Sequence, residues 1–168
     1  MTKRHYRLTY ILLAFLSLCV LATSLWLQYV GGYEPCSLCH MQRAVVLLLF
    51  MFSLLGSLLN SLKRAKKIAF FQMLFSLLGL FLVGRQLWLQ SFPAGSAPAC
   101  LPDLSILIHY FPWQSVFKAL FWGSASCGEV SKLLWGLSVP VWAGFYFFFM
   151  LFMAIALYFV LTKERFEK

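Results

Sequence analysis

Long stretches without a charged residue divide the chain into four apolar segments. Four runs free of Asp, Glu, Lys and Arg contain 26, 19, 17 and 30 residues, at 8–33, 44–62, 68–84 and 133–162. A bilayer core about 30 Å thick requires roughly 20 helical residues, so each run can supply one span, the shortest with the help of flanking charges that reach the interface. The predicted spans are 8–30, 44–62, 68–90 and 139–161. The pattern predicts an all-α, four-helix transmembrane bundle.

Two of the apolar stretches require a separate interpretation. The stretch 104–117 is short and contains His109 and Pro112, which favours a helix lying at the membrane interface within a long loop. The first segment resembles a signal peptide, because Ala22-Thr23-Ser24 is similar to a cleavage site. Its hydrophobicity continues through Tyr29, however, beyond an ordinary signal core, so an uncleaved anchor is favoured.

The composition supports this interpretation and excludes a soluble globule. Of the 168 residues, 62% are hydrophobic, 18% aromatic and only 11% charged, which leaves too little polar surface for a water-soluble fold. The chain is therefore expected to form a single integral membrane domain, 1–168. The net charge of +9 also suggests nucleic-acid binding. That class is disfavoured because the charges flank the spans instead of forming one basic stripe.

The distribution of basic residues orients the bundle. Ten of the fourteen are predicted at one membrane face: Lys3, Arg4, Arg7, Lys63, Arg64, Lys66, Lys67, Lys163, Arg165 and Lys168. With two glutamates this face carries +8, and the other face carries +1. Because basic residues are retained on the cytoplasmic side, both termini are predicted to be cytoplasmic. The loops at 31–43 and 90–137 then lie outside.

Four of the five cysteines fall in these two external loops. Cys36 and Cys39 immediately precede the second span, and Cys100 and Cys127 lie in the long loop. Thiols form stable pairs only in an oxidising compartment, so the placement indicates redox chemistry at the outer surface. Cysteines three positions apart at a helix start can close a small disulfide, and the helix N-terminus favours the thiolate. The first pair is predicted to be reactive.

The second pair has two possible roles. A bond between Cys100 and Cys127 would close a loop of 28 residues, which corresponds to stabilisation on the order of 3 to 4 kcal/mol. It could be a static structural disulfide, but the tighter pair nearby favours exchange between the two. Four cysteines allow three pairings, and the sequence leaves the resting connectivity open.

Two alternatives use the same cysteines to bind a metal. His40 completes Cys-x-x-Cys-His, the attachment signature of c-type haem, so a membrane-anchored c-type haem protein using Cys36, Cys39 and His40 is the alternative function. The motif runs directly into a span, however, and haem attachment leaves the second pair without a role. A structural zinc site with four thiolates is less favoured, because the second pair is widely spread and an oxidising compartment promotes disulfides. No metal site is predicted.

The order of several motifs resembles one known family. Cys36-Ser37-Leu38-Cys39 is followed by Arg43, then by Gly84-Arg85-Gln86-Leu87-Trp88-Leu89-Gln90 with Pro93 ahead of Cys100, and finally by Cys127-Gly128-Glu129 ahead of 135–142, Trp-Gly-Leu-Ser-Val-Pro-Val-Trp. This order over nearly the whole chain is similar to the disulfide-bond formation protein B (DsbB) family. A Cys-x-x-Cys motif alone would be weak support, but its position relative to the spans and the second pair is specific.

The resemblance implies a thiol:quinone oxidoreductase of the bacterial inner membrane. Such a protein reoxidises a periplasmic thioredoxin-fold DsbA-like oxidase and passes two electrons to a quinone, ubiquinone or menaquinone. By motif, Cys100 would be attacked by the partner's thiolate and Cys127 released, while Cys36 and Cys39 would take the electrons onward. Cys39 would face the quinone, with Arg43 one turn further on to stabilise negative charge on its oxygen.

Three other residues receive structural interpretations. Cys19, in the middle of the first span, is expected to be an inert apolar side chain. Arg85 is expected to extend toward the interface beside Trp88, and His109 to be an interfacial polar residue.

Overall fold

The computed structural model describes residues 3–32, 36–58, 62–92, 112–114 and 137–166. Four long helices account for most of them: α1 (Lys3–Tyr29), α2 (Ser37–Leu58), α3 (Leu62–Gln90) and α6 (Val139–Phe166). Each is long and apolar enough to cross a membrane. The predicted all-α, four-helix membrane bundle is confirmed.

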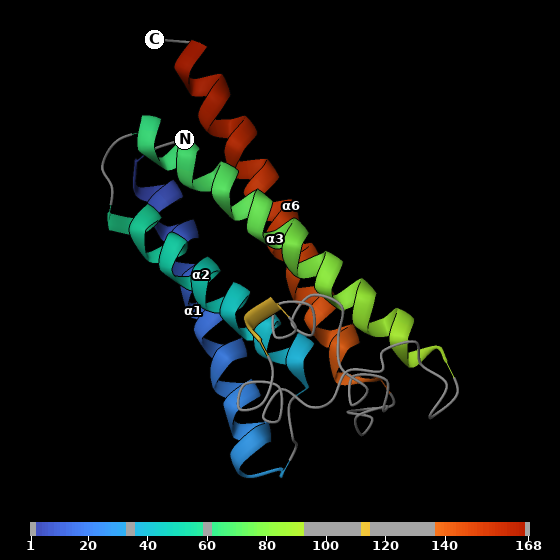
Figure 1. Ribbon diagram of the computed structural model, residues 1–168. Coiled ribbons are helices and arrows are strands. Elements are labelled where there is room, and N and C mark those ends of the chain that lie inside the picture. The colour runs from blue at the N-terminus through green and yellow to red at the C-terminus, as the bar shows by residue number, and fades with distance from the viewer. Residues whose placement is uncertain (1–2, 33–35, 59–61, 93–111, 115–136, 167–168) are drawn as a thin grey trace.

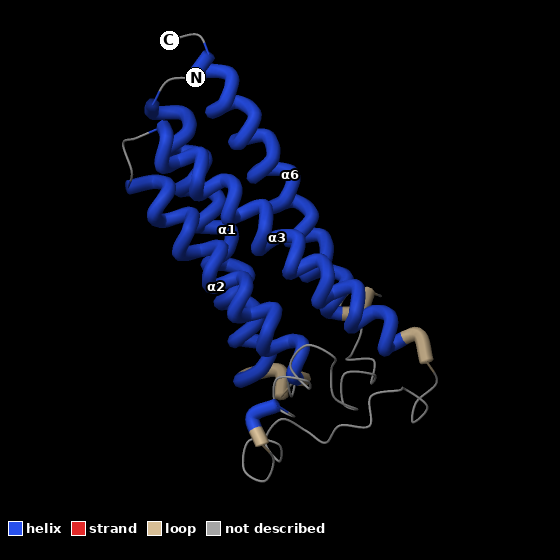
Figure 2. The backbone as a smooth tube through the Cα atoms, turned by 45° about the horizontal axis from the view of Figure 1, so that its top comes forward, coloured by secondary structure: helices blue, strands red, loops and turns tan. Residues whose placement is uncertain are grey.

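The four helices run alongside one another in a bundle (Figure 1, Figure 2). The most extensive packing joins α3 to α6, α1 to α2 and α2 to α3. The start of α1, the end of α2, the start of α3 and the end of α6 lie at one end of the bundle (Figure 1). The basic segments that were predicted to lie at one membrane face therefore share one end of the bundle. The Cys-x-x-Cys motif lies at the other end.

The helices extend beyond the spans predicted from charge. α2 begins at Ser37, although its span was predicted from 44, and α3 begins at Leu62, before the predicted start at 68. α6 ends at Phe166, after the predicted end at 161. Charged residues end a hydropathy segment but do not end a helix, because their long side chains can reach polar partners while the backbone remains helical. α1 ends at Tyr29, ahead of the glycine pair in which Gly32 has a φ of 65°.

Small residues allow two close approaches between helices in the core. A Cβ atom on Gly56 of α2 would lie 2.6 Å from the ring of Tyr10 on α1, and one on Gly79 of α3 would lie 2.4 Å from the ring of Phe147 on α6. Both rings are fully buried. Because lipid tails are as apolar as the core, this close packing is a main source of association between membrane helices.

Buried polar side chains also join neighbouring helices. The Tyr10 hydroxyl donates to the carbonyl oxygen of Ala65 at 3.1 Å, and the hydroxyls of Ser17 and Tyr146 lie 2.7 Å apart. The Gln72 amide donates to the hydroxyl of Ser53 at 2.8 Å. In hydrocarbon such groups require protein partners, so these contacts help to fix the register of the helices.

Candidate functional site

The Cys-x-x-Cys motif forms the first turn of α2. The carbonyl oxygen of Cys36 accepts a 3.2 Å hydrogen bond from the backbone N–H of His40, so Cys36 caps the helix and Cys39 lies in its first turn. The two Sγ atoms are 3.1 Å apart, and both residues are partly buried. The first N–H groups of a helix have no carbonyl partner within it, and the helix dipole is positive there. This environment favours a thiolate.

A pair of glutamine side chains lies behind the two sulfurs. Nε2 of Gln86, on α3, lies 3.3 Å from Sγ of Cys39 and 3.7 Å from Sγ of Cys36. Nε2 of Gln42, on α2, donates a 2.8 Å hydrogen bond to Oε1 of Gln86. Both glutamines are buried. α3 therefore provides a polar group at the reactive pair from a position 47 residues further along the chain.

Arg43 lies one turn further into α2 and contacts α1. Its Nε atom donates to Oγ of Ser24 at 2.6 Å, and its NH2 group donates to the carbonyl oxygen of the same residue at 3.0 Å. The NH1 group donates to Oε1 of Gln28, one turn along α1. These bonds hold a partly buried positive charge near the end of the bundle that carries Cys39.

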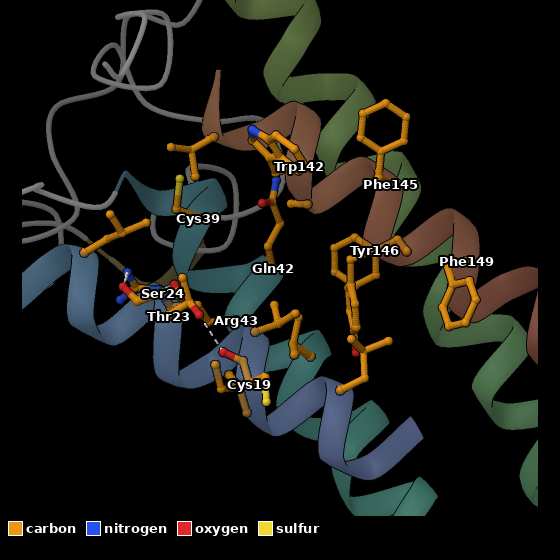
Figure 3. Close-up of a pocket in the computed structure, with 18 residues that line it drawn as sticks. Cys19, Thr23, Ser24, Cys39, Gln42, Arg43, Trp142, Phe145, Tyr146 and Phe149 are labelled. Carbon is orange, nitrogen blue, oxygen red and sulfur yellow. Dashed lines mark hydrogen bonds between the residues drawn. The ribbon is translucent and has the colours of Figure 1, made fainter. Parts of the chain in front are cut away.

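A cavity of about 550 Å³ lies between α1, α2 and α6. Cys39, Gln42 and Arg43 contribute to its wall from α2. Figure 3 shows Gln42 beside Trp142 of α6 and Arg43 beside Ser24 of α1, and residues of both helices complete the wall. The remaining lining is mostly apolar: Leu16, Cys19, Val20, Leu21, Thr23, Ser24, Leu27, Val46, Val139, Trp142, Ala143, Phe145, Tyr146, Phe147 and Phe149.

The cavity reaches the outer surface of the bundle between α1 and α6. Trp142, Phe145 and Phe149 of α6 are 43%, 59% and 44% exposed, and Cys19 and Thr23 of α1 are also exposed. In a membrane protein, apolar side chains exposed at the level of the spans face lipid. This side of the cavity is therefore lined by side chains of the kind that face lipid.

Comparison with known proteins identifies the family. The family model described as Disulfide bond formation protein DsbB matches residues 6–157. The chain belongs to the DsbB family. It is 36% identical over 134 residues to Disulfide bond formation protein B 1 of Pseudomonas aeruginosa, covering 79% of this chain and 82% of that protein. It is 33% identical over 155 residues to Disulfide bond formation protein B of Acinetobacter baumannii, covering 91% of each.

Membership of the DsbB family establishes the class of activity. The chain is a multi-pass membrane oxidoreductase that functions in disulfide bond formation. The alternative of a c-type haem protein built on Cys36, Cys39 and His40 is not supported. In the structure, His40 is an exposed residue of α2.

The structure describes only part of the site predicted from the sequence. Cys36, Cys39 and Arg43 lie close together around the first turns of α2, and Cys39 and Arg43 share the cavity. Cys100 and Cys127 lie outside the described residues. The same holds for His109 and, apart from 112–114, for the predicted interfacial helix at 104–117.

Several residues at the site were not assigned a role from the sequence. Gln86 was noted only as part of a motif, and Gln42 and Ser24 were not noted as site residues. Uncharged polar residues within an apolar span were the available signal, because such residues usually face a partner within the bundle.

Cys19 was expected to be inert, and it lines the cavity. Arg85 lies over the ring of Trp88, with its Cζ atom 4.4 Å from the ring centroid.

Proposed function

We propose that this chain is a protein-dithiol:quinone oxidoreductase whose quinone substrate binds in the cavity between α1, α2 and α6. In the reaction, the dithiol of Cys36 and Cys39 becomes a disulfide, and its two electrons and two protons convert the quinone to a quinol. The observation that carries the proposal is the position of Cys39 in the wall of a largely apolar cavity that is also lined by exposed side chains of α1 and α6.

The residues around the cavity suit a quinone. Its volume of about 550 Å³ falls within the usual range for small-molecule sites, and its walls are largely apolar. A quinone, ubiquinone or menaquinone, accepts the electrons and acquires negative charge on oxygen during reduction. The guanidinium of Arg43 can stabilise that charge, because its position is already fixed by Ser24 and Gln28.

The second cysteine pair is proposed to connect this site to a protein substrate. A thiolate of a periplasmic DsbA-like oxidase attacks Cys100 and releases Cys127, and a second exchange leaves the partner oxidised and the pair reduced. The reduced pair then transfers its electrons to the Cys36–Cys39 disulfide by thiol–disulfide exchange. The family supports this role, and the basic end of the bundle supports an inner-membrane orientation with cytoplasmic termini and periplasmic cysteines.

Quinone reduction by the purified full-length protein tests the proposal. With a reduced DsbA-like oxidase as donor, absorbance changes should show quinol formation, and Cys36→Ser and Cys39→Ser should each abolish it. A partner lacking its second active-site cysteine should become trapped as a mixed disulfide on Cys100. Trapping on Cys36 would reverse the proposed order. Undiminished quinone reduction by Cys39→Ser would contradict the role of the cavity.

A further inference from the structure

The reactive sulfurs are contacted by a buried side chain that the reaction scheme above does not use. Gln86 is only 2% exposed, and its Nε2 atom lies within hydrogen-bonding distance of both Cys39 and Cys36. A buried amide forms its hydrogen bonds with protein groups, because water cannot reach it to replace them. The two N–H groups of Gln86 are thus directed to the atoms that change oxidation state.

We propose that Gln86 stabilises the thiolate of the Cys36–Cys39 pair, chiefly on Cys39, and that Gln42 is a positioning residue that fixes the orientation of the Gln86 amide. The inference rests on the proposed function, because it concerns the pair that reduces the quinone. It adds a hydrogen-bond donor on α3 to a redox site otherwise built on α2.

The orientation of the Gln86 amide determines whether it stabilises or destabilises the thiolate. A carboxamide has two N–H donors on nitrogen and only lone pairs on oxygen. Gln42 donates to Oε1 of Gln86, which leaves Nε2 directed at the sulfurs. In the reverse orientation an oxygen would face a thiolate and repel it. The hydrogen bond from Gln42 therefore holds the amide in the orientation that favours negative charge on sulfur.

Stabilising the thiolate also changes the oxidising strength of the pair. The thiolate occurs only in the reduced state, and a disulfide sulfur is a weak acceptor, so donation from Gln86 favours the reduced state. A pair whose reduced form is stabilised is a stronger oxidant. It then takes electrons more readily from the upstream cysteine pair.

The competing explanation is that the two glutamines merely hold α2 and α3 together. A second buried amide on α3 separates these explanations, since Gln72 is 1% exposed and donates to Ser53 of α2 at 2.8 Å. It lies 14 positions before Gln86, which is about 21 Å along a helix and far from the sulfurs. Gln72→Met removes a similar contact between the same helices and is the matched control.

The test measures the pH dependence of Cys39 alkylation. Full-length reduced protein is treated with iodoacetamide, and labelled peptides are quantified by mass spectrometry. Gln86→Met retains the length of the side chain without its donors, and should slow alkylation of Cys39 at neutral pH about tenfold and raise the midpoint by about one pH unit. Gln86→Glu should raise the midpoint further, because a carboxylate would face the sulfur. Gln72→Met should leave it unchanged.

A redox titration against glutathione provides a second measurement. In protein carrying Cys100→Ser and Cys127→Ser, so that one external pair remains, Gln86→Met should shift the equilibrium about tenfold toward the disulfide, which is about 30 mV for two electrons. If Gln86→Met cannot be purified, Gln42→Met should shift both measurements in the same direction by a smaller amount.

An unchanged alkylation midpoint in Gln86→Met would overturn the proposal, as would an equal shift in Gln72→Met. These outcomes are independent of the quinone assay. If wild-type protein reduces quinone but the Gln86 variants titrate like wild type, the proposed function stands and this inference fails. If the variants shift but quinone is not reduced through Cys39, the proposed function fails instead.

Discussion

The Nε atom of Arg43 donates a 2.6 Å hydrogen bond to the hydroxyl of Ser24, which joins α2 to α1 beside the cavity. With the bonds to the Ser24 carbonyl and to Gln28, three of the five N–H donors of the guanidinium are engaged. Two donors remain on a group that lines the cavity. Arg43 is therefore held by α1 while it retains capacity for a ligand.

Replacing Arg43 should impair the reaction with quinone specifically. Loss of a hydrogen bond from a charged group costs about 1.5 to 3 kcal/mol, so Arg43→Ala should lower kcat/KM for quinone roughly ten- to hundredfold. Stopped-flow absorbance of quinol formation measures this effect. Ser24→Ala removes only one acceptor and should cause a loss of a few fold. Oxidation of the DsbA-like partner in a single turnover is the control, and equal loss in both reactions would contradict a quinone-specific role.

Filling the cavity should weaken quinone binding without affecting the cysteines. Ala143 lines the cavity on α6, so Ala143→Leu places three additional carbon atoms in it. Overpacking commonly costs about 1 to 3 kcal/mol, and we expect the KM for quinone to rise about tenfold. Ala22, an exposed residue of α1 that does not line the cavity, provides the matched control. The KM for quinone is measured by steady-state kinetics. An equal rise in KM for Ala22→Leu would contradict quinone binding in the cavity.

The Cys19 sulfur should not be required for quinone reduction, although it lies in the cavity wall. Cys19 is on α1, and Figure 3 shows it among the lining residues, away from Cys39. Cys19→Ala should leave the rate of quinone reduction within about twofold of wild type, because the side chain acts there as a small apolar group. The same stopped-flow assay checks this. A loss as large as that of Cys39→Ser would assign Cys19 to the redox pathway.

The sequence was sufficient to predict the bundle because hydrocarbon imposes one dominant constraint. Long uncharged runs can enter the bilayer only as helices whose backbone groups are paired internally, so four such runs predict four spans. The start of α2 was less accessible to this reasoning. Arg43 was treated as a boundary, but it lies inside the helix because Ser24 and Gln28 on α1 accept its hydrogen bonds. Hydropathy carries no information about such contacts between helices.

The candidate site was predictable only where its residues are close in sequence. Cys36, Cys39 and Arg43 fall within two turns of one helix, so their proximity followed from helical spacing. Gln86 approaches the same sulfurs from another helix, and its role depends on the packing of α3 against α2. Only the folded structure shows that approach. The roles of Cys100 and Cys127 stay predictions.

The close approach of α3 to α6 predicts which glycine can accept a side chain. A Cβ on Gly79 would lie 2.4 Å from the fully buried ring of Phe147, whereas one on Gly84 of the same helix would meet nothing within 4 Å. Gly79→Ala should lower the free energy of unfolding by about 1 to 3 kcal/mol, since the ring has no space in which to move. Gly84→Ala should leave stability unchanged or raise it by up to about 1 kcal/mol through helix propensity. Unfolding titrations in mixed micelles followed by circular dichroism measure both, and equal midpoints for the two variants would contradict tight packing at Gly79.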